Sequence, residues 1–186
     1  MRWVVIALVS ASLVRPALAE KQLWAGGELG LATLGLLTPQ RTDLKPKDSA
    51  TAFTLGVTAR YGLSSLLSVG AGARITFGVD SLVVGEGGNQ LDARARIAVG
   101  KAVAARVKAY GFVSPGYTVI YDGNLEPSGF LLDFGAGAAY ALGPGIALTA
   151  ELGLQLAFLH YDGVFEEEKM TQRYAHLTVG FVIPVW

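Results

Sequence analysis

The sequence contains no cysteine, which excludes a disulfide scaffold and any metal site with thiolate ligands. It has no excess charge of either sign, because 15 basic residues are matched by 15 acidic ones. This balance gives no preference for a polyanion, and no basic stripe typical of a nucleic-acid-binding protein is present. We therefore expect no nucleic acid partner, and no motif in the chain calls for a cofactor.

Past the first 20 residues, the sequence also lacks an apolar run long enough to form a transmembrane helix. Its longest uncharged stretch lies between Asp133 and Glu151. Several glycines and one proline interrupt this stretch, which makes it typical of two strands joined by a turn. If the chain crosses a membrane, it must do so as a closed β-barrel, the other architecture that satisfies every backbone group in lipid.

What the sequence has in abundance is glycine and apolar residues. Glycine accounts for 24 of the 186 residues, nearly twice the typical share of about 7%. The mean hydropathy is +0.43, which is high for a soluble domain. The length suits a single domain, but this composition does not suit an ordinary soluble α/β domain.

The first 19 residues have the pattern of a secretory signal peptide. Arg2 supplies a short positive region, residues 3–14 are apolar, and Ala17 and Ala19 form an A-x-A cleavage site. We therefore expect residues 1–19 to be removed on export, and residues 20–186 to form the barrel domain predicted below. An uncleaved anchor helix is the alternative, but the apolar run is too short to span a bilayer well.

From Trp24 onward, apolar residues alternate with small or polar ones, as in strands whose successive side chains point to opposite faces. Residues 51–62 show the pattern most clearly. The apolar face of this segment consists of Phe53, Leu55, Val57, Ala59 and Tyr61. Its opposite face carries small or polar residues, so one face of the strand is suited to an apolar environment and the other is not.

The alternation is divided into eight segments, each of which reaches the ~9–11 residues of a tilted transmembrane strand. These segments are residues 23–32, 51–62, 67–78, 90–100, 105–120, 130–142, 146–158 and 174–186. The connections between them are alternately long and polar, or short. This rhythm predicts an all-β fold, an eight-stranded antiparallel up-and-down transmembrane β-barrel with both termini at the end of the short turns.

The alternation alone fits a soluble barrel with its apolar face inside as well as a transmembrane barrel with that face in lipid. On the polar face, small residues predominate, which suits the narrow interior of an eight-stranded barrel. The charges within the segments are mainly Arg, Asp and Glu, whereas the lysines fall mostly in the connections. Because the planar Arg side chain suits enclosed ion pairs and Lys prefers water, we predict the transmembrane barrel.

Charged residues on the polar face form the first candidate site, an interior charge network. The predicted members are Glu28, Arg60, Arg74, Asp92, Arg94, Arg96, Asp133 and Glu151. Aligning the third and fourth segments across their connection places Arg74 almost opposite Asp92. We interpret the network as paired charges that fill a polar lumen. The alternative is an ion pathway that is gated by exchanging pairs.

Aromatic residues are concentrated near the predicted strand ends, where they are typical of the two interfacial girdles of a membrane barrel. The expected girdle residues are Phe53, Tyr61, Phe77, Tyr117, Phe130, Tyr140, Phe158, Tyr174 and Trp186. Ordinary strand propensity is the alternative explanation, since aromatic residues are enriched in all strands.

The last segment ends in glycine, two residues, an apolar residue, any residue, another apolar residue and a terminal aromatic one. The residues in this pattern are Gly180, Phe181, Ile183, Val185 and Trp186. They resemble the C-terminal assembly signal of outer-membrane barrels, and the whole chain after the signal peptide resembles the small eight-stranded members of that class, the OmpA-type transmembrane domain and its single-domain relatives.

The resemblance implies the outer membrane of a Gram-negative-type bacterium, with both termini in the periplasm. It also implies recognition of the C-terminal signal by the barrel assembly machinery, and contact with outer-membrane lipids and lipopolysaccharide. It names no extracellular partner. We predict a structural or surface-interaction role with the loops outside. A narrow low-conductance pore and an exported soluble ligand-binding barrel are the alternatives.

Other polar clusters match no catalytic or metal motif. Outer-membrane lipid A deacylases use a His-x-Ser pair, and the residues after His160 and His176 do not match it. Asp162 and the acidic run 166–168 could bind Ca²⁺, but their spacing fits no EF-hand, and charge runs are usually solvated. The glycine-rich segment 85–88 lacks the Lys-Ser/Thr ending of a phosphate loop. We therefore expect no catalytic residue and no metal ligand.

Overall fold

The computed structural model describes residues 21–39, 51–80, 87–121, 126–143, 145–162 and 167–185. They form eight strands, which are β1 (Leu23–Pro39), β2 (Thr51–Gly62), β3 (Leu67–Asp80), β4 (Gly87–Ala104), β5 (Val107–Tyr121), β6 (Ser128–Gly143), β7 (Ile146–Asp162) and β8 (Glu167–Pro184). None of the described residues belongs to a helix that could cross a membrane.

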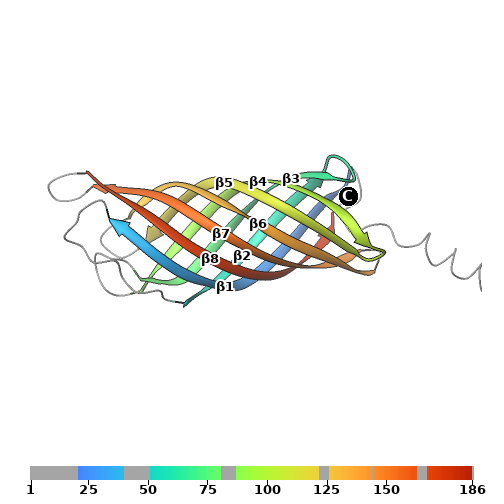
Figure 1. Cartoon of the computed structure of the whole chain (residues 1–186), viewed down its shortest axis with the longest axis horizontal. Helices are drawn as coiled ribbons and strands as arrows, with labels where there is room; N and C mark the ends of the chain where they lie inside the picture. The colour runs from blue at the N-terminus through green and yellow to red at the C-terminus, as the bar shows by residue number, and fades with distance from the viewer. Residues whose placement is uncertain are drawn as a thin grey trace, which may run out of the picture.

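The eight strands form one closed barrel. Each strand pairs antiparallel with its neighbour in the sequence, and β1 also pairs antiparallel with β8. Figure 1 shows the strands tilted around the barrel axis, with the β2–β3 and β4–β5 turns and the C-terminus at the same end. Closure leaves no sheet edge with unpaired backbone groups. The predicted fold, an eight-stranded antiparallel up-and-down barrel, is confirmed.

Burial follows the two-residue alternation, with the apolar face outside. In β2, Ala52 and Thr54 are buried inside the barrel, whereas Leu55 and Val57 are 50% and 62% exposed. Thirty large apolar side chains among the described residues are exposed in the same way. Water would penalise so continuous an apolar surface, because soluble monomers rarely expose patches larger than a few hundred Å². The outer face of this barrel therefore suits lipid.

The strands extend further than the sequence pattern predicts. The first strand continues to Pro39, where we expected a polar connection from residue 33, and the last strand begins at Glu167 and not at Tyr174. The short turn expected at residues 100–104 lies at residues 105–106. Ladder hydrogen bonds hold these extensions together. The apolar alternation marks only the part of a strand whose outer face is apolar. The hydrogen bonding between neighbouring strands continues beyond that part.

Exposed aromatic side chains lie at the end of the barrel opposite the short turns. Phe53 on β2 stacks on Phe77 of β3 with ring centroids 6.3 Å apart, and Phe130 on β6 stacks on Phe158 of β7 at 6.5 Å. Tyr174 was wrongly assigned to a girdle, because its side chain is inside the barrel and only 2% exposed. Trp186 lies outside the described residues.

Candidate functional site

The barrel interior contains two clusters of charged side chains, and Glu151 of β7 is the centre of the first. Arg96 of β4 donates from Nη1 to Oε1 at 3.0 Å and from Nη2 to Oε2 at 2.6 Å. Arg60 of β2 and the hydroxyl of Tyr110 on β5 each donate to Oε1 at 2.7 Å. Both carboxylate oxygens are therefore bound, and Oε1 accepts three hydrogen bonds.

Aromatic rings complete this first cluster. The guanidinium carbon of Arg96 lies 3.9 Å from the centre of the Phe112 ring, and that of Arg60 lies 5.6 Å from the centre of the Tyr110 ring. A cation over a ring face is stabilised by the ring quadrupole, and more strongly where water is excluded. Two arginines share one carboxylate in this cluster, and the aromatic rings thus partly compensate the excess positive charge.

Asp133 of β6 is the centre of the second cluster. Its Oδ2 accepts a hydrogen bond from Arg94 at 2.7 Å, and its Oδ1 lies 2.8 Å from Nε2 of His176 on β8. Arg94 also donates to Glu28 of β1 at 2.7 Å, and Nη2 of Arg74 lies 3.6 Å from Asp133. Arg94 therefore joins carboxylates from β1 and β6, which lie on different sides of the barrel.

Arg74 of β3 lies directly opposite Asp92 of β4 in the strand register, as the sequence alignment of these segments predicts. Its Nε lies 3.4 Å from Asp92 Oδ2, and its Nη2 donates to Gln155 and to the hydroxyl of Tyr174. Arg74 is 1% exposed. Such a buried cation would be costly if it were left without partners.

Asp92 has partners besides Arg74. Its Oδ1 accepts hydrogen bonds from the Thr118 hydroxyl at 2.7 Å and from the Gln90 amide at 2.8 Å. The Tyr174 hydroxyl donates to Oδ2 at 3.3 Å. Neutral donors thus hold Asp92, so its charge does not depend on a single cation.

The structure brings all eight predicted charged residues into these two clusters. The first combines one carboxylate with two arginines, and the second combines three carboxylates with two arginines and His176. Together they contain equal numbers of carboxylates and arginines. Because unpaired ions are costly away from water, this balance explains how a narrow interior accommodates eight charges.

Apolar clusters lie on either side of the charges along the barrel axis. Trp24, Ala141, Ala147 and Val182 pack together at the end with the short turns. At the opposite end, eight buried residues form another cluster, Ala32, Ala52, Val79, Ile120, Leu131, Ala157, Leu159 and Tyr174. Apolar side chains therefore also line the interior toward both ends, alongside buried polar residues such as Lys108 and Gln172.

Several buried polar atoms have no hydrogen-bond partner among the described residues. Both amide atoms of Gln172, the amide nitrogen of Gln155, and the hydroxyls of Thr54 and Thr76 belong to this group. Buried polar groups are normally paired with protein or with ordered water. These atoms therefore mark positions in the interior where water molecules would be stabilised.

The pattern of charges in the sequence does not reveal the neutral members of the network. Gln90, Tyr110, Thr118, Gln155 and Tyr174 all contact its charges. The two-residue alternation could have identified them. Each of these side chains points to the same face of its strand as an inward-facing charged residue, or lies beside such a residue on the neighbouring strand. Aromatic character concealed Tyr174, which we expected at the membrane interface.

The model of one protein family, described as the outer membrane protein beta-barrel domain, matches residues 4–182 of the chain. The chain belongs to this family. Its location is therefore the outer membrane, and its strands are transmembrane strands. No curated protein matches the chain in a sequence search.

Solved structures of outer-membrane barrels have the same fold as this barrel. Neisserial surface protein A has a TM-score of 0.62 at 14% identity, covering 87% of this chain and 96% of that one. OprG from Pseudomonas aeruginosa has a TM-score of 0.58 at 14% identity, covering 89% and 97%. AlkL, solved in DMPC lipid bilayers, has a TM-score of 0.53 at 14% identity, covering 89% and 91%. At such identity the likeness establishes the fold alone.

The two histidines of the outer-membrane barrel lie in different environments. His176 is buried against Asp133, and His160 is exposed near the far end of β7. Within the described residues, no group of three or more His, Asp or Glu side chains is placed to hold a metal ion. Glu166 of the acidic run lies outside the described residues.

The residues of the predicted assembly signal lie on both faces of β8. Phe181, Ile183 and Val185 are 51%, 42% and 45% exposed on the outer face. Gly180 faces inward, where a Cβ atom would come 2.4 Å from the carbonyl oxygen of Gly27 on β1. On the outer face, a Cβ atom added at Gly27 would lie 3.5 Å from the Phe181 ring. These residues therefore also contribute to the β1–β8 seam that closes the barrel.

Proposed function

We propose that this outer-membrane barrel is a structural or surface-interaction protein, with a lumen filled by side chains and with its longer loops outside the cell. The observation that carries the proposal is the network around Glu151 and Asp133. Its ion pairs join side chains from β1, β2, β3, β4, β6, β7 and β8 across the interior. An eight-stranded barrel leaves an interior just wide enough for side chains.

The energetics of the network favour a closed interior. Opening a continuous path would separate Arg96 from both oxygens of Glu151, or Arg94 from Asp133. Removing one partner of a buried ion pair typically costs about 3–5 kcal/mol. Apolar clusters at both ends add a second obstacle, because an ion would have to leave its hydration water to pass Trp24 or Leu131.

Planar-bilayer recording tests the closed lumen. We expect the purified barrel to give no stepwise conductance. Stepwise conductance in the wild type that disappears with Arg74→Ala or with Glu151→Gln would contradict the proposal, because it would place a conducting path through the network.

The proposed orientation has the short turns and both termini in the periplasm, as in barrels with short periplasmic turns and longer outer loops. The chain has no cysteine, so a single introduced one gives labelling without background. In intact cells, a membrane-impermeant maleimide should label Glu126→Cys, at the end with the long connections, but not Ser64→Cys, in the β2–β3 turn. Labelling of Ser64→Cys in intact cells would reverse the orientation.

A narrow pore is the second candidate function, and the unpartnered interior atoms favour it. Gln172, Gln155, Thr54 and Thr76 offer hydrogen bonds to water inside the barrel. A file of water through these positions would permit a small conductance. The same bilayer recording separates the two functions, because a pore predicts reproducible conductance steps and the filled lumen predicts none.

A further inference from the structure

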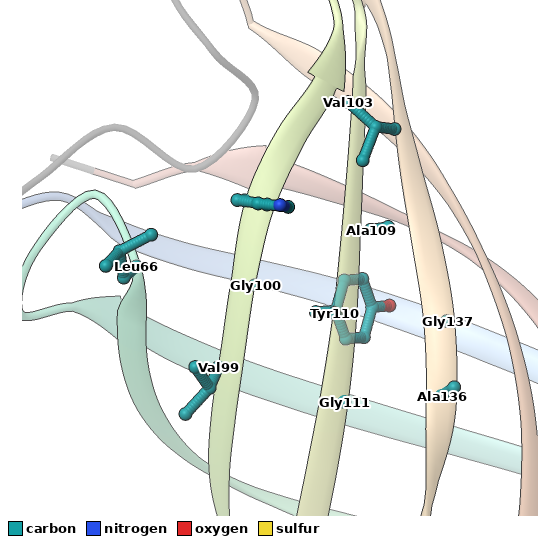
Figure 2. A pocket seen from close by; sticks show the side chains of 10 residues that line it. Leu66, Val99, Gly100, Val103, Ala109, Tyr110, Gly111, Ala136 and Gly137 are labelled. Atoms are coloured by element: carbon teal, nitrogen blue, oxygen red, sulfur yellow. The ribbon is translucent and has the colours of Figure 1, made fainter.

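A groove of about 490 Å³ lies on the outer face of the barrel at the end with the short turns. Lys101 and Val103 of β4, Gly111 of β5 and Ala136 of β6 line it, beside Leu66 of the β2–β3 turn. Figure 2 shows Leu66 and Val99 on one side of Gly111 and Ala136 on the other, with Val103 above Ala109 at the top of the view.

The floor of the groove exposes backbone because its side chains are small. A Cβ atom at Gly111 would meet a single neighbouring atom within 4 Å, the carbonyl oxygen of Gly135 at 3.7 Å. The fold therefore leaves room for a larger residue at this outward-facing position. Gly27, which also faces outward, is different because a Cβ atom there would lie 3.5 Å from the Phe181 ring. No described side chain covers Gly111 in this way.

Basic residues lie at the short-turn end of the groove, and Lys101 is part of its lining. Lys101 lies opposite Ala109 in the β4–β5 register, and Arg106 occupies the turn that joins these two strands. Both side chains are exposed, as is Lys21 at the same end of the barrel. The described residues at this end, in the ranges 21–26, 60–68, 98–111, 136–149 and 180–185, include no carboxylate. An apolar groove with cations at its end matches an apolar chain that carries an anionic head.

We propose that this groove binds one anionic phospholipid of the periplasmic leaflet, with an acyl chain over Ala109, Gly111 and Ala136 and the phosphate beside Lys101 and Arg106. The bound acyl chain fills the space over the uncovered backbone. A lipid that did not enter the groove would make fewer dispersion contacts there. Basic residues at a membrane surface attract anionic lipids, and Lys near the interface extends its ammonium group toward the headgroups. The choice of leaflet rests on the orientation proposed above, whereas the site itself does not.

Native mass spectrometry of the full barrel, released from detergent micelles with added lipid, tests the proposal. Phosphatidylglycerol is the anionic probe and phosphatidylcholine, with no net charge, is the comparison. We expect the wild type to retain one phosphatidylglycerol at concentrations at which phosphatidylcholine is lost. The double variant Lys101→Gln/Arg106→Gln should bind phosphatidylglycerol about 30-fold more weakly, as expected for the loss of two basic residues near an anionic headgroup.

Groove-filling variants separate this site from the lipid that surrounds the whole barrel. Gly111→Leu places a side chain in the groove without a backbone clash, so it should fold and lose the bound phosphatidylglycerol. Ala71→Leu on β3 is the matched control, because it enlarges an exposed outer-face residue away from the groove, and it should bind as the wild type does.

Equal retention of the two lipids, unchanged binding by Gly111→Leu, or an equal loss in Ala71→Leu would overturn the proposal. If the maleimide experiment instead reversed the orientation while phosphatidylglycerol binding followed these variants, the groove would stand and only its leaflet would change.

Discussion

Arg96 holds Glu151 through both oxygens of the carboxylate, at 3.0 Å and 2.6 Å, in the middle of the barrel interior. This bidentate geometry is the strongest arrangement available to an ion pair of this type. Arg60 and Tyr110 bind the same carboxylate. A single acidic residue on β7 therefore holds side chains of β2, β4 and β5.

Substitution of Glu151 by glutamine tests this relationship. It leaves Arg60 and Arg96 buried without a carboxylate, because the other carboxylates belong to the second cluster. We expect the free energy of unfolding to fall by about 3–5 kcal/mol. Urea unfolding of the barrel in phospholipid vesicles, followed by intrinsic fluorescence, measures the change. Glu126→Gln is the control, since Glu126 is exposed, and it should change stability by less than ~0.5 kcal/mol.

Arg74→Ala should loosen the barrel by removing the cation that joins Asp92, Gln155 and Tyr174. The loss should be smaller than for Glu151→Gln, because Thr118 and Gln90 still donate to Asp92. In the double variant Arg74→Ala/Asp92→Asn, the buried charge of Asp92 is also removed. The two changes should therefore couple by about 0.5–3 kcal/mol, with the double variant more stable than the sum of the single ones predicts.

The temperature at which the folded band disappears on an unheated-to-heated gel series measures this coupling. Strict additivity of Arg74→Ala and Asp92→Asn would contradict the pairing, as would wild-type gel mobility and melting in Arg74→Ala.

The alternation of residues predicted the fold because each face of a barrel strand has one environment. It also predicted that Arg74 lies opposite Asp92, since register follows from the length of a connection once two neighbouring strands are known. It could not predict which charges meet across the lumen. The contact between Glu28 and Arg94 joins β1 to β4, and such contacts depend on the tilt of the strands and on side-chain length.

Aromatic residues show the same limit. Phe53 and Tyr174 both lie near strand ends in the sequence, yet the first is 46% exposed on the outside and the second is buried inside. An aromatic ring suits either face of this barrel, because the outer face contacts lipid and the inner one contains arginines that pack on rings. The spacing of two residues between Tyr174 and the inward-facing His176 is the signal that separates the two possibilities.

Two adjacent glycines on β1 should tolerate alanine very differently. A Cβ atom at Gly26, which faces inward, would lie 2.0 Å from the carbonyl oxygen of Phe181 on β8. At Gly27, which faces outward, the nearest atom is in the Phe181 ring at an ordinary contact distance of 3.5 Å. We expect Gly26→Ala to lower the unfolding free energy by about 1–3 kcal/mol through overpacking, and Gly27→Ala to be nearly neutral.

Urea unfolding in vesicles measures both glycine variants under the same conditions. Equal stability of the two variants would mean that the β1–β8 seam can separate without cost. That result would argue against the close approach of the two backbones at Gly26.

Two interior tyrosines that bind carboxylates should differ in the energy their hydroxyls contribute. Tyr110 donates to Glu151 at 2.7 Å, a short bond to a charged acceptor. The contacts of the Tyr174 hydroxyl with Asp92, Arg74 and Gln90 are all 3.3–3.4 Å long. Tyr110→Phe should therefore cost about 1.5–3 kcal/mol, whereas Tyr174→Phe should cost less than ~1 kcal/mol because the other donors to Asp92 remain.

Both substitutions keep the aromatic ring and leave no cavity, so unfolding in vesicles compares the hydroxyls directly. A larger loss for Tyr174→Phe would show that the second cluster, and not Glu151, contributes more to holding the strands together.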